Sequence, residues 1–384
     1  MQRFYFDHNA TTPVAPEVLE TMVSCLGQVY GNASSIHHFG QAAKQRLEAA
    51  RRQVAALIHA SANDIVFTGG GTEADNLAVL GVVHAAARRP VHVVTSAMEH
   101  PAVLAPCRQL EAAGVEVTRL RVGQAGVVSS DDVERALRPE TVLVSIMHAN
   151  NELGTIQPIA EIARIARAAG VPLHVDGVQA LGKIAVDVDA LGVDLYSMSG
   201  HKLYAPKGVG ALYVRKGTRL APVIFGGHHE RDRRPGTENV PGIAAFGAAA
   251  ELAGRSLAAD GERLSMLRDR LEKAVLETIP GTGVNGSKWN RTPNTSNLYF
   301  DGIDGEALVI ALDLRGFAVS TGAACSSGAI APSHVLTAMG VSADRARASM
   351  RFSLGRGNDV AQIDALVEAL QASVTHLRRI SVHA

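Results

Sequence analysis

The feature that most constrains the fold is an alternation of two kinds of segment between about residues 40 and 255. Short runs rich in β-branched residues alternate with Ala-rich stretches of helical periodicity. This alternation is typical of βαβ units, in which helices connect parallel strands and cover the sheet. It predicts an α/β fold with a mostly parallel, seven-stranded sheet flanked by helices. The expected strands span residues 64–68, 91–96, 116–121, 142–147, 173–175, 195–199 and 210–214.

The Ala-rich segments give the expected helices and, with them, a domain boundary. We expect helices over residues 41–58, 72–87, 101–113, 130–136, 158–169 and 240–253. The sequence turns polar at 255–262, and residues 263–277 then predict a separate helix that leads into a second domain. We therefore expect a large domain over residues 12–255 and a smaller α+β domain formed by residues 1–11 and 256–384.

Charge and cysteine content exclude several classes of function. The 37 Lys and Arg residues balance 37 Asp and Glu residues, so no overall field attracts nucleic acid or an anionic membrane. The sequence shows no basic and apolar leader and no apolar stretch of about 20 residues, which predicts a cytoplasmic protein without membrane contact. Cys25, Cys107 and Cys325 are too widely spaced for a zinc site or a disulfide framework, so we expect separate thiols and no intrinsic metal.

A carboxylate and a lysine follow two of the expected strands. Asp176 closes the apolar run 171–175, and Lys202 comes shortly after the strand at 195–199. Both side chains are expected at the C-terminal edge of the sheet, where α/β proteins bind ligands. Pyridoxal phosphate needs a lysine for a Schiff base and a carboxylate that keeps its ring nitrogen protonated. The pair fits this cofactor, and a solvated pair of loop residues is the alternative interpretation.

A glycine-rich turn lies where a phosphate group can bind. The run Gly69-Gly70-Gly71-Thr72 stands between an expected strand and an expected helix, where free backbone N–H groups and the helix dipole favour an anion. Gly71 and Thr72 are therefore candidate phosphate ligands. The alternative is a plain strand-to-helix turn with Thr72 as the N-cap. The turn matches neither the Walker pattern nor the dinucleotide-binding pattern.

Further polar side chains follow other strands. His100 comes after the strand at 91–96, Asn151 after the strand at 142–147, and Gln179 shortly after Asp176. An imidazole at this edge can stack on a cofactor ring and move protons, whereas a lone loop histidine is also a common helix cap or surface residue. Asn151 and Gln179 can bond a ring hydroxyl or the substrate.

Two residues of the expected smaller domain also carry useful chemistry. Cys325 lies in residues 320–329, a run of almost only small side chains. Structural cysteines are usually buried, whereas a nucleophilic thiol must be reached by its target, so this position favours a reactive thiol. Arg351 lies on a strand-like segment at 348–353. Its guanidinium fork can hold an α-carboxylate, and an ordinary surface arginine is the alternative.

An ordered series of motifs runs through the chain. The motifs lie at residues 5–12, 31–37, 71–76, 99–100, 148–154, 175–179, 199–202, 234–239, 321–326 and 351–356. On these motifs the chain resembles, over essentially its whole length, the NifS/IscS-type cysteine desulfurases. These are fold-type I pyridoxal-phosphate enzymes related to the class V aminotransferases. Gly71 and Gly177 stand where relatives often have Ala.

The resemblance implies a role for the matched residues that face the cofactor. Lys202 is implied as the Schiff-base lysine, Asp176 as the partner of the ring nitrogen and Gln179 as the partner of the ring hydroxyl. His100 is implied as the residue that stacks on the ring and moves protons. The implied phosphate ligands are Gly71, Thr72, Ser199 and His201, with Thr237 from the neighbouring subunit of a homodimer.

The resemblance also implies the reaction and its partners. Asn151 and Arg351 match positions that hold the cofactor and the substrate carboxylate. L-cysteine would become L-alanine, and Cys325 would take the sulfur as a persulfide. The implied acceptor is an iron–sulfur scaffold protein or another sulfur acceptor, and Cys325 could transiently ligate an iron–sulfur cluster during transfer.

Three other functions remain open on the sequence. An aminotransferase or a selenocysteine lyase could use the same scaffold, but a transaminase has no use for the thiol of Cys325. A non-catalytic persulfide carrier is a third alternative, and the intact pair of Lys202 and Asp176 argues against it. The acceptor itself stays open between an iron–sulfur scaffold, a tRNA-thiolation protein and the nitrogenase assembly proteins.

Overall fold

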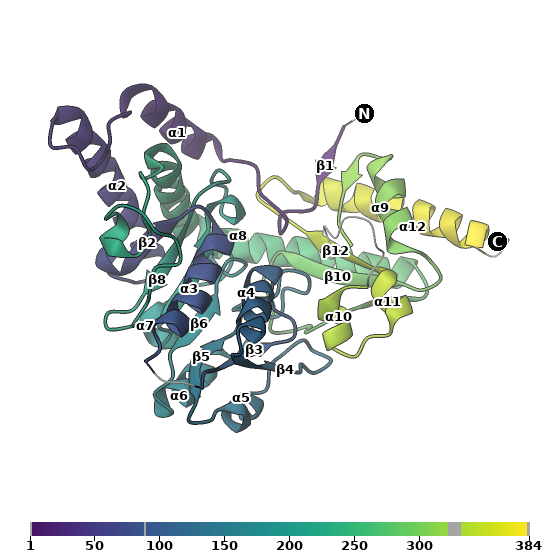
Figure 1. Cartoon of the computed structure of the whole chain (residues 1–384). Coiled ribbons are helices and arrows are strands. Elements are labelled where there is room, and N and C mark those ends of the chain that lie inside the picture. Colours follow the sequence, from purple (N-terminus) through teal and green to yellow (C-terminus); the bar gives the residue numbers. More distant parts are fainter. Residues whose placement is uncertain (1, 88–89, 322–331, 382–384) are drawn as a thin grey trace.

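The computed structural model describes residues 2–87, 90–321 and 332–381, and its largest unit is a seven-stranded sheet (Figure 1). The strand order is β2-β8-β7-β6-β5-β3-β4, and β8 pairs antiparallel with both of its neighbours while the other pairs are parallel. The predicted α/β fold with a mostly parallel seven-stranded sheet is confirmed. The strands are Ile65–Thr68 (β2), His92–Ser96 (β3), Glu116–Leu120 (β4), Thr141–Ser145 (β5), Leu173–Asp176 (β6), Leu195–Ser199 (β7) and Gly210–Val214 (β8).

Most strands of this sheet are buried on both faces, which explains their continuous apolar sequence. Val93 and Leu143 pack into a core on one face of the sheet, which also contains Leu77 from helix α3 (Gly71–Ala85). Their neighbours Val94 and Val144 point to the opposite face and join the largest core of the molecule. Only β4, at one edge, has partly exposed residues along most of its length among the strands of this sheet.

Helices cover the sheet and extend into the C-terminal part of the chain (Figure 1). Five of the seven predicted helices have bounds within a few residues of the observed ones. No helix in the described part of the chain is long and apolar enough to cross a membrane. The α-helices are Pro16–Gln28 (α1), His38–Leu57 (α2), Gly71–Ala85 (α3), Pro101–Ala112 (α4), Ser130–Ala136 (α5), Ile159–Ala168 (α6), Val188–Leu191 (α7), Val240–Thr278 (α8), Gly305–Asp313 (α9), His334–Ala338 (α10), Ala343–Arg347 (α11) and Val360–Ser381 (α12).

Helix α8 corrects one prediction. The two helices expected over residues 240–253 and 263–277 form a single helix of 39 residues. The polar segment between them stays helical because its side chains lie on the exposed and half-buried sides of the helix, where polar groups remain in contact with solvent. In Figure 1 this helix reaches from beside the large sheet to the strands β10 and β12.

The C-terminal part of the chain forms a second, smaller sheet. Strand β10 (Thr295–Phe300) pairs antiparallel with both β9 (Thr282–Val284) and β12 (Ser349–Ser353). The N-terminal segment joins this region, since β1 (Phe4–Tyr5) pairs in parallel with β11 (Phe317–Ala318). A separate hydrophobic core lies here and includes Phe6, Leu271, Phe300, Phe352 and Leu370.

Candidate active site

A cavity of about 830 Å³ lies at the C-terminal edge of the large sheet. Its walls come from the turns after β2, β3, β5, β6 and β7, and it is completed by the N-terminal segment and β12. Ten of the residues predicted for the site line it, namely Gly71, Thr72, His100, Asn151, Asp176, Gln179, Ser199, His201, Lys202 and Arg351. Thr237 is exposed and does not line this cavity, and Cys325 lies outside the described residues.

The glycine-rich turn after β2 has the form of an anion-binding site. Helix α3 begins at Gly71, and its N-cap is Gly70, which offers no side chain, so the alternative in which Thr72 caps the helix is wrong. The first N–H groups of such a helix lack partners within it. A methyl group added at Gly71 would stand 2.8 Å from Val178 Cγ2, so the turn is closely packed against the opposite wall. The buried Ser199 Oγ on that side has no hydrogen-bond partner among the described residues, and a phosphate oxygen would satisfy it.

Asp176 is a buried acid at the end of β6, with 6% of its surface exposed, which rules out the solvated loop pair. One carboxylate oxygen accepts the Val178 N–H at 3.0 Å. Burial raises the pKa of Asp176 to about 6, and the neighbouring Asp75 adds to this rise, while His100 opposes it. A cation next to this carboxylate would stabilise its charged form, and a protonated pyridine nitrogen is such a cation.

Lys202 lies on a short 3₁₀ turn that follows β7. Its Nζ donates to the backbone carbonyl of Ala10 at 2.6 Å and to that of Asn9. Burial, followed by the charge of Arg351, lowers the pKa of Lys202 to about 8. A lysine with this pKa has a larger neutral, nucleophilic fraction at neutral pH than an ordinary lysine.

His100 caps helix α4 and lines the cavity at the same time. Its Nδ1 accepts the backbone N–H of Ala102 at 3.1 Å, so His100 is a helix cap, as the alternative interpretation expected, as well as a cavity residue. Burial lowers the pKa of His100. The negative charge of Asp176 raises this pKa, whereas Lys202 and His334 lower it further. A neutral ring whose Nδ1 accepts a hydrogen bond carries its proton on Nε2. In the neutral form, His100 therefore lines the cavity with its proton on Nε2.

Arg351 is a buried residue of β12 and not a surface arginine, since only 3% of it is exposed. Its guanidinium contacts Asp7 Oδ1 at 2.6 Å and the backbone carbonyl of Asn151 at 3.1 Å. The Nε of Arg351 is buried and lacks a hydrogen-bond partner in the described part of the chain. Arg351 thus keeps an unused donor in a cavity wall that can receive a carboxylate.

The sequence matches a family model that covers nearly all of this architecture. The match to the model for "Aminotransferase class-V" extends over residues 4–366. The chain belongs to the class-V aminotransferase family. All ten predicted residues that line the cavity fall within the matched segment.

Curated class-V relatives and solved structures are similar over almost the whole chain. The cysteine desulfurase IscS of Dictyoglomus turgidum is 47% identical over 377 residues, which are 98% of this chain and 96% of that protein. The cysteine desulfurase IscS of Anaeromyxobacter dehalogenans is 49% identical over 98% of this chain and 94% of its own length. Among solved structures, a NifS-like protein has a TM-score of 0.92 at 36% identity and covers 98% of this chain and 100% of its own. A NifS-like protein from Rickettsia africae has a TM-score of 0.87 at 33% identity, with 97% and 100% covered.

The cavity also involves polar residues that were not predicted from the sequence as site residues. Asn9 and Asp75 line the cavity, and Lys183 reaches it from behind through Gln179 and Asn9. Asn9 lies within the N-terminal motif of residues 5–12, which is a signal that could have found it. Lys183 follows Gln179 by four residues, a spacing at which side chains meet on a helical turn, and this signal was available too.

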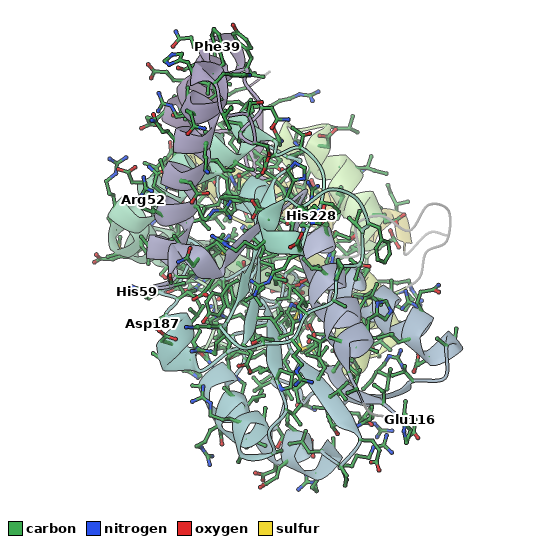
Figure 2. All side chains as sticks on the ribbon, turned by 60° about the vertical axis from the view of Figure 1, so that its left-hand side comes forward. Phe39, Arg52, His59, Glu116, Asp187 and His228 are labelled. Carbon is green, nitrogen blue, oxygen red and sulfur yellow. The ribbon has the colours of Figure 1, made fainter. Side chains whose placement is uncertain are left out.

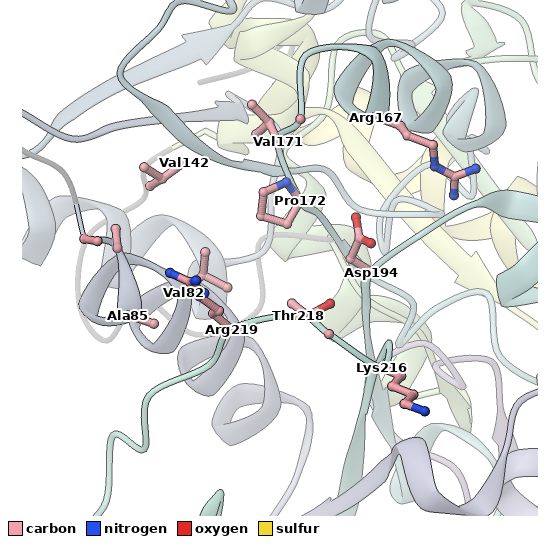
Figure 3. A pocket seen from close by; sticks show the side chains of 14 residues that line it. Val82, Ala85, Val142, Arg167, Val171, Pro172, Asp194, Lys216, Thr218 and Arg219 are labelled. Carbon is pink, nitrogen blue, oxygen red and sulfur yellow. The ribbon is translucent and has the colours of Figure 1, made fainter.

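A second hollow, of about 780 Å³, lies at the opposite edge of the large sheet (Figure 3). It is lined by the end of α3, the segment before β6 and the turn after β8. Figure 3 shows the charged ends of Arg167, Lys216 and Arg219 well apart from one another. Since these charges do not converge on one point, the hollow lacks the organisation of the cavity at the other edge.

Proposed function

We propose that the chain is a pyridoxal-phosphate-dependent cysteine desulfurase that converts L-cysteine to L-alanine. The observation that carries this proposal is the meeting of Asp176, Lys202 and Arg351 in one cavity. These residues supply a partner for a ring nitrogen, an amine that can bond a carbonyl carbon, and a cation for a carboxylate. The relatives named cysteine desulfurase at 47% and 49% identity support the same activity.

The residues of the cavity fit the cofactor. When bound, pyridoxal phosphate supplies an electron sink for the charge that develops at the substrate Cα. Lys202 would hold it covalently, Asp176 would hold its ring nitrogen, and Gln179 would hold its ring oxygen. The phosphate group would lie against Gly71, Thr72, Ser199 and His201. The N-terminus of α3 lies here, and so does the Ser199 hydroxyl, which has no partner in the described part of the chain.

Proton transfer falls to Lys202 and His100. A lysine with a pKa of about 8 can take a proton and return it near neutral pH. Because the capping bond occupies Nδ1, the neutral ring of His100 keeps its N–H at Nε2, where it could donate a hydrogen bond to the substrate. We propose that Lys202 moves the proton at Cα and that His100 would donate a hydrogen bond to the substrate sulfur.

The sulfur step requires a thiolate, and Cys325 is our candidate. Its sulfur attacks the substrate sulfur, an S–S bond forms, and the Cβ–S bond breaks. The electron pair of the broken bond stays on carbon, which takes up a proton, so L-cysteine and one thiol give L-alanine and one persulfide. Free thiols have a pKa of about 8.5, so Cys325 needs a proton acceptor in the site.

Arg351 is our proposed anchor for the substrate α-carboxylate. Replacing it by Ala should raise the KM for L-cysteine about ten- to a hundredfold, the loss expected for a charge-assisted contact, with a smaller effect on kcat. Arg351→Lys keeps the charge but not the guanidinium fork, so its KM should lie between those of the wild type and Arg351→Ala. Steady-state kinetics with alanine as the measured product test this. Thermal unfolding controls for the loss of the Asp7 contact, and an unchanged kcat/KM in a folded Arg351→Ala variant would place the carboxylate elsewhere.

We also propose that the enzyme is a homodimer, and exposed apolar side chains support this. Leu19, Val23 and Leu26 are spaced along one face of α1, and each is more than half exposed. Ile36 is 94% exposed. The ring of Phe39, which Figure 2 shows at the N-terminal end of α2, stacks on Tyr30 with ring centroids 5.3 Å apart. A second copy of the chain is the partner that would cover this surface.

The loop that carries Thr237 supports the same arrangement. Three consecutive non-glycine residues before it, Glu230, Arg231 and Asp232, have positive φ angles of 43°, 57° and 64°. This strained turn is held by a buried ion pair in which Glu230 receives two hydrogen bonds of 2.7 Å from Arg51. Thr237 itself is exposed and does not line the cavity of its own chain, which is compatible with a contribution to the phosphate site of a neighbour.

Subunit mixing tests the shared site. Neither Lys202→Ala nor Thr237→Asp alone should support turnover, because one lacks the amine and the other places a negative charge against the phosphate. In a mixed dimer, one site combines an intact Lys202 with an intact Thr237, so co-refolded mixtures should recover part of the wild-type activity. Light scattering of the wild type should give twice the chain mass. A single-chain mass, or no recovery on mixing, would contradict the proposal.

The remaining parts of the proposal concern location, delivery and domains. We propose that the protein works in the cytoplasm, where thiols stay reduced, and that it hands sulfur to an iron–sulfur scaffold protein or a similar acceptor. We also propose that residues 12–255 act as the large domain and that residues 1–11 and 256–384 act as the smaller one. The separate core around Phe6 and Leu271 supports this division.

A direct experiment tests the proposed activity. Purified protein with pyridoxal phosphate, given L-cysteine and a thiol reductant, should release alanine and sulfide in equal amounts. A selenocysteine lyase would turn over selenocysteine and leave L-cysteine unchanged, and an aminotransferase would need a keto acid and form pyruvate derivatives instead of alanine. A persulfide carrier would bind no cofactor and would stay colourless.

A further inference from the structure

Lys183 is an amine with no assigned role that lies beside the catalytic residues. It belongs to the turn after β6, and its Nζ donates to Asn9 Oδ1 at 2.9 Å and to Gln179 Oε1. The charged groups that act on it most strongly are Lys202 and Arg351, both of which are cations. Burial and these two cations lower the pKa of Lys183 well below its ordinary range. Burying a lysine beside two cations costs free energy, and the contacts of its two hydrogen-bond acceptors indicate what this position achieves.

Both residues that accept hydrogen bonds from Lys183 are connected to the amine of Lys202 through the backbone carbonyl of Asn9. Gln179 Nε2 donates to the backbone carbonyl of Asn9 at 2.9 Å, and Lys202 Nζ donates to the same oxygen. The side chain of Asn9 is fixed from its other side by Thr295, whose Oγ1 accepts from Asn9 Nδ2 at 2.8 Å. Lys183, Asn9 and Gln179 therefore form a hydrogen-bonded cluster around the carbonyl that holds the reactive amine.

This cluster permits a single orientation of the Gln179 side chain. On one side, the amine of Lys183 donates to the amide oxygen. On the other side, the carbonyl of Asn9 can only accept, so it selects the amide nitrogen. Reversing the amide would bring two donors together at Lys183 and two acceptors together at Asn9. The second N–H of Gln179, which lines the cavity, is then the group offered to a cofactor oxygen.

We propose that Lys183 is a positioning residue of this enzyme, which acts through Asn9 and Gln179 to fix the Lys202 amine and the Gln179 N–H in the cavity. The inference rests on the proposed function, because the positions of these groups matter only where Lys202 bonds the cofactor. Without Lys183, Gln179 can turn and Asn9 loses a donor, so the Lys202 amine is no longer held at one place.

Cofactor uptake by the cofactor-free protein tests the role. Apoprotein is titrated with pyridoxal phosphate while the absorbance of the lysine-bound form is followed. Lys183→Met should bind the cofactor about tenfold more weakly, as expected when one hydrogen-bonded cluster is broken. Lys183→Gln keeps donors without charge and should recover part of this loss. Lys273→Met, a matched change of an exposed lysine on α8, should leave the affinity unchanged.

A double-mutant cycle separates this role from a merely structural one. If Lys183 acts through Gln179, then Lys183→Met should cost little more in a protein that already carries Gln179→Ala. Losses that multiply would contradict the proposal, as would wild-type affinity in Lys183→Met. Thermal unfolding identifies any unfolded variant, and if Lys183→Met does not fold, Lys183→Gln is used in the same cycle. Failure of the wild type to bond the cofactor at Lys202 would refute the proposed function instead.

Discussion

Lys202→Ala is expected to abolish the conversion of L-cysteine, with a loss of at least about a thousandfold, while the protein stays folded. The amine of Lys202 projects among the residues that would hold the cofactor, and its pKa of about 8 makes it both a nucleophile and a proton carrier. Its hydrogen bonds are to the backbone carbonyls of Asn9 and Ala10, so the methyl side chain of Ala removes contacts but leaves no buried charge behind. Alanine release and the absorbance of lysine-bound cofactor are the measurements, and both should vanish.

The matched control is Lys216→Ala, at the opposite edge of the sheet. It removes a lysine without touching the cavity, so turnover should remain at the wild-type level. Circular dichroism of both variants should match the wild type. Retained absorbance of a lysine-bound cofactor in Lys202→Ala would assign the covalent role to another residue.

Much of this site could be predicted because of how parallel sheets are built. Asp176 ends a buried strand, His100 and Lys202 each follow one, and parallel strands bring their C-terminal ends to one edge. The strand pattern therefore placed these residues together before any contact was known. Arg351 was harder to place, because a strand arginine is usually exposed, and only the packing of β12 against the N-terminal segment shows that it is buried.

Other features depend on contacts between distant segments, and sequence periodicity does not contain them. Lys183 meets Asn9 across 174 residues of chain, so its role depends on the fold. Gly177 is closely approached by the Tyr196 ring, and a methyl group there would lie 1.9 Å from Cε1 of that ring, so Ala would require the ring to shift. Helix α8 runs through a polar segment that resembled a boundary, because exposure along a long helix resembles a linker in composition.

Cys325→Ser is expected to have the second large effect, a loss of sulfur transfer with the cofactor site intact. Serine has nearly the same size as cysteine, but its hydroxyl supplies no thiolate and cannot carry persulfide sulfur. In the proposed mechanism, binding of the cofactor and the substrate depends on Lys202, Asp176 and Arg351, all of which line the cavity. The variant should therefore still change the cofactor spectrum when L-cysteine is added, although alanine release should fall to the background rate.

Two controls separate this loss from a general effect of removing a thiol. Cys25 and Cys107 are buried and have no part in the proposed mechanism. Burial raises the pKa of both thiols, which makes them poorer nucleophiles. Cys25→Ala and Cys107→Ala should transfer sulfur normally in preparations that remain folded.

The measurement that tests the central claim most directly is the mass of the peptide that contains Cys325 after the protein has reacted with L-cysteine. In the wild type this peptide should gain one sulfur atom, which a thiol reductant removes, and one alanine should form for each sulfur transferred. In Cys325→Ser the peptide should gain nothing. If Cys325→Ser released alanine and sulfide at the wild-type rate, transfer through a persulfide on Cys325 would be contradicted and a lyase mechanism would take its place.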